Sequence, residues 1–119
     1  MSRTRGVALQ REFAAYLARE GWVGAESAGS GRQGRDILGT PGVAWEVKTA
    51  GAANLRPAAW IAQAARNSGI GDYSAVAWFP PGVAMGSPGK VVAMMPLTHL
   101  VTLMKMAQVI PSSPVQVIA

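Results

Sequence analysis

The side chains best suited to chemistry are two acids and a lysine near the middle of the chain. The sequence holds only six acidic residues, and Asp36 is followed by the pattern Glu46-Val47-Lys48. Alternate residues of a strand share a face, so Glu46 and Lys48 point the same way. If Asp36 lies beside Glu46 across a hairpin, two carboxylates and an ammonium converge. Two carboxylates can hold Mg²⁺, and a lysine can orient a water or stabilise developing charge. The trio therefore predicts a site for phosphodiester hydrolysis.

The same pattern has a simpler interpretation. An acid followed by Glu-x-Lys arises often by chance, and an exposed Glu–Lys pair is worth under about 1 kcal/mol. Two observations favour a site. Val43, Trp45 and Val47 occupy the other face of the strand and are expected to enter the core, and acids are scarce elsewhere.

The composition restricts the possible functions. Eleven Lys and Arg against six Asp and Glu give a formal net charge of +5, which favours a polyanion such as nucleic acid, although a basic surface also aids solubility. The chain has no cysteine and one histidine, His99, which excludes a disulfide scaffold and a zinc site of several Cys or His ligands. No apolar run is long enough to cross a membrane and no secretion signal is recognisable, so we expect a cytoplasmic protein, encoded by a phage or its host.

Hydrophobic spacing and turn residues predict one domain over residues 1–119, with the order α-β-β-β-α-β-β-α. This order predicts an α/β fold with a mixed central sheet flanked by helices. The apolar tail 108–119 has no assigned structure and is a candidate for a dimer interface. The expected helices are Arg5–Glu20, Pro57–Ser68 and Leu97–Ala107, and the expected strands are Trp22–Ala25, Asp36–Leu38, Val43–Thr49, Ser74–Phe79 and Val91–Met95.

With these residues identified, the sequence resembles the archaeal-type Holliday junction resolvases and their bacteriophage relatives, from Arg5 to about Leu103. The most specific anchor is Ser27-Ala28-Gly29-Ser30, which precedes the aspartate. The remaining anchors are Arg5-Gly6, Arg11-Glu12, Gly21-Trp22, Asp36-Ile37 and Glu46-Val47-Lys48.

The resemblance implies a PD-(D/E)XK nuclease core, a homodimer, and paired symmetric nicks in four-way DNA junctions. It implies that Asp36 and Glu46 bind Mg²⁺, which Mn²⁺ can replace, and that Lys48 is the catalytic lysine. Ser30 matches a serine beside the active site, and Arg11 matches a helix arginine implicated in DNA contact or catalysis.

Two positions depart from the family pattern and leave a further metal ligand open. Gln10 stands where the family usually has a glutamate, and Glu26 stands where it often has an arginine. Glu26 or Glu12 could supply the missing carboxylate instead. Gln10 and Glu12 lie about 200° apart around an ideal helix, so both cannot face one metal.

Further basic and amide residues are candidates for DNA contact, with an ordinary solvated surface as the alternative for each. Gln63 lies on the helix after the Glu-x-Lys strand, where related nucleases often carry a glutamine near the site. The full set of candidates is Arg3, Arg5, Arg11, Arg32, Arg35, Gln63 and Arg66.

Three hypotheses follow. The first is a structure-selective junction endonuclease. The second is a PD-(D/E)XK nuclease that cuts flaps, ends or specific sites, because a fold does not fix its substrate. The third is a DNA-binding module with a degenerate site, for which Gln10 is the only support.

Overall fold

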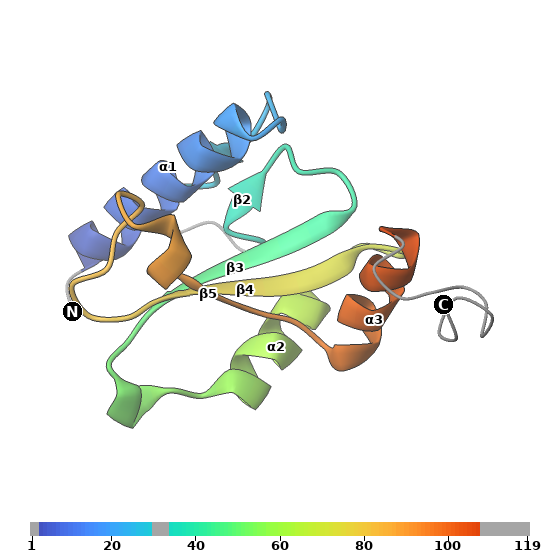
Figure 1. Ribbon diagram of the computed structural model, residues 1–119. Helices are drawn as coiled ribbons and strands as arrows, with labels where there is room; N and C mark the ends of the chain where they lie inside the picture. Colours follow the sequence, from blue (N-terminus) through green and yellow to red (C-terminus); the bar gives the residue numbers. More distant parts are fainter. Residues whose placement is uncertain (1–2, 30–33, 108–119) are drawn as a thin grey trace, which may run out of the picture.

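The centre of the fold is a mixed β-sheet with helices on both faces (Figure 1). The computed structural model describes residues 3–29 and 34–107. Strand β3 (Val43–Thr49) runs parallel to β4 (Tyr73–Phe79), and the short β5 (Val92–Met94) pairs with β4 antiparallel. The sheet order is β3-β4-β5, so β4 is the central strand. The expected α/β class with a mixed sheet is confirmed.

Helices α1 (Arg3–Arg19) and α2 (Pro57–Arg66) lie on opposite faces of this sheet (Figure 1). Helix α2 is the crossover that a parallel β3–β4 pair requires, and Pro57 at its first turn suits a helix start. The third helix, α3 (Leu97–Met106), follows β5 and contacts the start of β4 through the Tyr73 and His99 rings, whose centroids are 5.3 Å apart.

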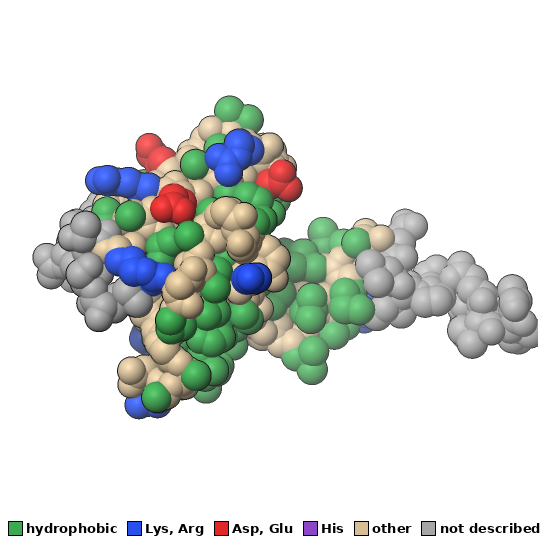
Figure 2. Space-filling model, turned by 60° about the vertical axis from the view of Figure 1, so that its left-hand side comes forward, with side chains coloured by type: hydrophobic (Ala, Val, Ile, Leu, Met, Phe, Trp, Pro, Cys, Tyr) green, Lys and Arg blue, Asp and Glu red, His purple; other side chains and the backbone are tan. Residues whose placement is uncertain are grey.

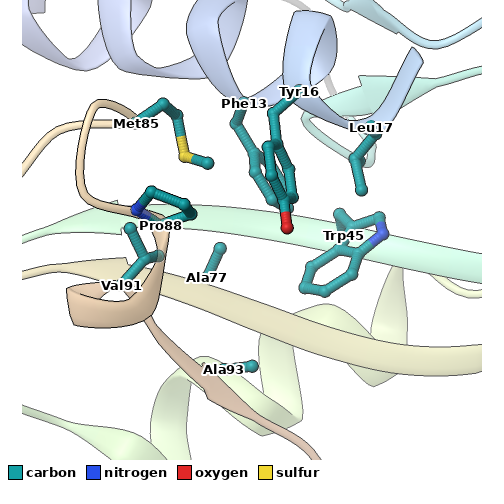
Figure 3. A pocket seen from close by; sticks show the side chains of 9 residues that line it. All are labelled: Phe13, Tyr16, Leu17, Trp45, Ala77, Met85, Pro88, Val91 and Ala93. Atoms are coloured by element: carbon teal, nitrogen blue, oxygen red, sulfur yellow. The ribbon is translucent and has the colours of Figure 1, made fainter. Parts of the chain in front are cut away.

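The main core lies between α1 and the sheet. Leu9, Phe13 and Leu17 recur at helical spacing and are buried, as the apolar face of the expected helix predicted. The Phe13 ring meets the Trp45 ring edge to face, with 4.9 Å between centroids. Beside these rings an apolar pocket of about 220 Å³ remains between α1, Ala77 and the segment around Met85 (Figure 3).

The prediction of a first strand at Trp22–Ala25 is wrong. Residues 22–25 form turns, in which the Ala25 N–H donates to the Trp22 carbonyl over 2.8 Å, and Val23 is 87% exposed. The apolar residues Trp22 and Val23 suggested a strand, but they do not pair with either sheet. The strand β1 instead occupies Glu26–Ser27, directly after these turns.

The expected hairpin between residues 36–38 and 43–49 is only partly formed. Strand β2 (Ile37–Leu38) pairs antiparallel with β1, and not as a ladder with β3. One backbone hydrogen bond, from the Asp36 N–H to the Trp45 carbonyl over 3.0 Å, joins the two segments. That bond is one of the contacts that place Asp36 next to the middle of β3.

The other expected elements are present with shifted ends. The first helix starts at Arg3 and ends at Arg19, and α2 ends at Arg66 rather than Ser68. Strand β4 begins one residue earlier than expected, and β5 and α3 are slightly shorter. Single-turn helices at Ala52–Asn54 and Pro88–Lys90 were not expected.

The tail 108–119 lies outside the described residues. No helix among the described residues combines the length and apolarity that a membrane span needs.

Candidate active site

Asp36 lies directly before β2, and its side chain reaches across to β3. Its Oδ2 accepts a hydrogen bond of 2.7 Å from the backbone N–H of Val47, while its own backbone N–H bonds Trp45. These two contacts fix both the main chain and the carboxylate of Asp36 against the stretch of β3 that carries Glu46. The acid pair that the sequence predicted is therefore brought together.

Glu46 lies in the middle of β3 and is buried, with 2% of its surface exposed. The sequence predicted that the Trp45 face of this strand enters the core, but it did not predict that α2 also covers the face that carries Ala44 and Glu46. Burial raises the pKa of Glu46 to about 7, the hydrogen bond from Asn67 acts in the opposite direction, and the negative charge of Asp36 adds to the rise.

Lys48 shares the Glu46 face of β3 and is half-buried. Its Nζ donates a hydrogen bond of 2.7 Å to Oε1 of Gln63 on α2. An ammonium has three donors, so two remain for a substrate oxygen or water. Gln63, predicted to contact DNA, therefore lies at the site as a partner of Lys48.

Asn67, which follows α2, is the residue that the sequence interpretation missed. Its Nδ2 donates to Oε1 of Glu46 and also to the carbonyl of Gly34 over 3.3 Å. Gln63 and Asn67 are four residues apart and therefore lie on one helical face. That spacing, read together with the Glu-x-Lys strand, was the available signal.

Arg35, also predicted to contact DNA, pairs with Asp72 at 2.7 Å and reaches the Asn67 carbonyl at 3.4 Å. Its guanidinium holds the pKa of Asp72 below its usual range, and the Gly69 N–H contributes in the same direction. Arg35 thus links the segment before Asp36 to the end of α2.

The candidates for a further metal ligand are Gln10, Glu12 and Glu26. Oε1 of Gln10 accepts a hydrogen bond of 3.2 Å from the Ser27 hydroxyl on β1. Glu12 and Glu26 are exposed. In residues 3–29 and 34–107 no group of three Asp, Glu, His or Cys side chains could hold a metal, so neither Glu12 nor Glu26 joins Asp36 and Glu46.

The remaining predicted residues divide into three kinds. Arg11 and Arg66 are exposed, which is compatible with phosphate contact. Arg5 is half-buried and donates to the Val83 carbonyl over 3.3 Å. Ser30 and Arg32, together with the side chain of Arg3, lie outside the described part of the chain.

The chemistry of the donor set fits a hard divalent cation. Asp36 and Glu46 offer carboxylate oxygens from neighbouring segments, and only one oxygen of each is engaged by Val47 or Asn67. Mg²⁺ commonly binds one or two carboxylates and completes its shell with waters and substrate phosphates. A cation also offsets the repulsion between two adjacent carboxylates.

The chain was compared with protein-family models, curated proteins and solved structures, and nothing matched in any of the three comparisons. The assignment of function therefore depends on the site itself.

Proposed function

We propose that the protein is a magnesium-dependent, structure-selective DNA endonuclease with a PD-(D/E)XK core, of the Holliday junction resolvase type. The observation that carries the proposal is the convergence of Asp36, Glu46 and Lys48, with Asp36 bonded to Val47 and Glu46 buried beside it. A carboxylate as deeply buried as Glu46 is rare unless it is paired or binds metal, and a cation shared with Asp36 would account for its burial.

Each residue has a defined part in this chemistry. Asp36 and Glu46 bind Mg²⁺, which when bound makes water more acidic and offsets charge on the scissile phosphate. Glu46 must lose its proton to bind the cation. Lys48, held by Gln63, places its ammonium where negative charge grows on the phosphate in the transition state.

Charge and surface features support a DNA partner and a second copy of the chain. The net charge of +5 favours a polyanion. Helix α3 has no buried residue and exposes Leu97, Leu100 and Met106, at 73%, 45% and 68%. Hydrophobic side chains cover the region beside the grey C-terminal residues in Figure 2. We propose that this face joins two copies, which would present two sites to the near-symmetric strands of a junction.

The test is a cleavage assay on a synthetic four-way junction, a flap and a linear duplex, each with Mg²⁺. We expect the wild type to nick the junction in paired positions, and Asp36→Ala to cut none of the substrates. Preferential cutting of the flap or duplex would keep the nuclease and replace the junction as substrate. Equal cutting by Asp36→Ala would refute the catalytic assignment.

A further inference from the structure

The Asn67 side chain joins the two segments that carry the acid pair. One amide nitrogen donates to Glu46 on β3 and to the carbonyl of Gly34, two residues before Asp36. A primary amide has two donor hydrogens, and both are used here. The same group therefore holds Glu46 by one oxygen and leaves the other oxygen free of Asn67.

The backbone of Asn67 is itself held at the end of α2. Its N–H bonds the carbonyls of Gln63 and Ala64, each over 3.2 Å. Its carbonyl accepts from Arg35 at 3.4 Å, and Arg35 is anchored by Asp72 at 2.7 Å. Asp72 also accepts from the Gly69 N–H over 2.9 Å, which ties the chain beyond α2 to the same carboxylate. These contacts fix the backbone position from which the Asn67 side chain reaches Glu46.

We infer that Asn67 is a positioning residue of the metal site, which presents the Glu46 carboxylate to the cation, and that the Arg35–Asp72 pair keeps Asn67 in place. The inference rests on the proposed function, because it concerns the same acid pair. Partners that orient a ligand contribute strongly to metal affinity, and their loss typically costs about tenfold to a hundredfold. Arg35 then acts through Asn67 and not through a DNA phosphate.

The first experiment measures the Mn²⁺ dissociation constant by titration calorimetry in the intact chain. Asn67→Ala should weaken binding by about tenfold or more. Asn54→Ala is the matched control, because Asn54 is the only other asparagine, is exposed, and should leave affinity unchanged. Unchanged affinity in Asn67→Ala would overturn the inference. Melting temperatures of both variants, measured without metal, separate a lost fold from a lost ligand contact.

A Glu46→Ala variant distinguishes failure of the inference from failure of the proposed function. If Glu46→Ala binds Mn²⁺ like the wild type, the proposed metal site falls, and the inference falls with it. If Glu46→Ala loses binding while Asn67→Ala retains it, only the inference falls.

Asp72→Asn and Arg35→Ala test the Arg35–Asp72 pair without changing Asp36 or Glu46. Both variants should weaken Mn²⁺ binding, and each should weaken it by less than Asn67→Ala does. Asp72→Asn keeps the positive charge of Arg35, so junction binding without metal should remain. Loss of junction binding in Arg35→Ala alone, with normal Mn²⁺ affinity in both variants, would show a phosphate contact and overturn this role of Arg35.

Discussion

The Asp36 carboxylate accepts a 2.7 Å hydrogen bond from the backbone N–H of Val47, the residue between Glu46 and Lys48. This contact ties an acid from one segment to the centre of a Glu-x-Lys strand in another. Because the donor is a main-chain group inside β3, the carboxylate keeps its place beside Glu46.

The stability of the metal-free protein should depend on the protonation of Glu46. Its pKa rises from 4.5 to about 7 on folding, so the folded state binds the proton more tightly than the unfolded state. This tighter proton binding adds up to about 3 kcal/mol to the free energy of unfolding. The added stability is fully present below pH 4.5, falls as the pH rises to about 7, and is lost at higher pH. Denaturant unfolding of wild type and Glu46→Gln between pH 4.5 and 8 checks this. Glu46→Gln should lack this fall, and equal slopes in both proteins would contradict it.

Metal binding should release a proton at acidic pH. A cation needs the Glu46 carboxylate deprotonated, so apparent Mn²⁺ affinity should rise up to about pH 7 and then level off. Calorimetry in buffers of different ionisation enthalpy counts the released protons. We expect release approaching one proton per ion near pH 5.5 and little at pH 8.5. Proton release that is equal at both pH values would argue that Glu46 is not a ligand.

Lys48 should act on the reaction and not on metal binding. Removal of its ammonium in Lys48→Ala should lower the single-turnover cleavage rate by roughly a hundredfold to a thousandfold, the usual effect of losing a group that stabilises transition-state charge. Its Mn²⁺ affinity should not fall. Lys90→Ala, at an exposed lysine on the Pro88–Lys90 turn, is the control and should cut normally. A rate for Lys48→Ala within a few-fold of the control would remove Lys48 from the mechanism.

The turn after β2 should tolerate no side chain at Gly39. Gly39 has φ +79°, and a Cβ there would collide with the Gly24 carbonyl oxygen. Gly42 has a similar φ of +88° with open space around it. Both alanine variants incur the left-handed backbone strain of about 1 kcal/mol, but only Gly39→Ala also forces the two loops apart. Thermal unfolding should therefore show a clearly larger loss for Gly39→Ala, and equal losses would contradict the close approach.

The sequence predicted the parts of the site that depend on local spacing. Glu46 and Lys48 share a face because strands alternate, and the turn residues 39–42 return the chain from Asp36 to β3. The role of Asn67 was not predicted, because it depends on how the α2 crossover lies on the sheet. The burial of Glu46 was missed for the same reason. The strand at Glu26–Ser27 was misplaced because Trp22 and Val23 resemble strand residues, whereas the pairing with β2 decides where β1 forms.

The most direct measurement of the central claim is the anomalous scattering of Mn²⁺ in crystals grown at a saturating concentration of the ion. We predict one peak between the carboxylates of Asp36 and Glu46, on the side of β3 that carries Lys48, with Asn67 still bonded to Glu46. A peak at other acids, or no peak with Glu46 in the same position, would contradict the claim that this pair binds the cation.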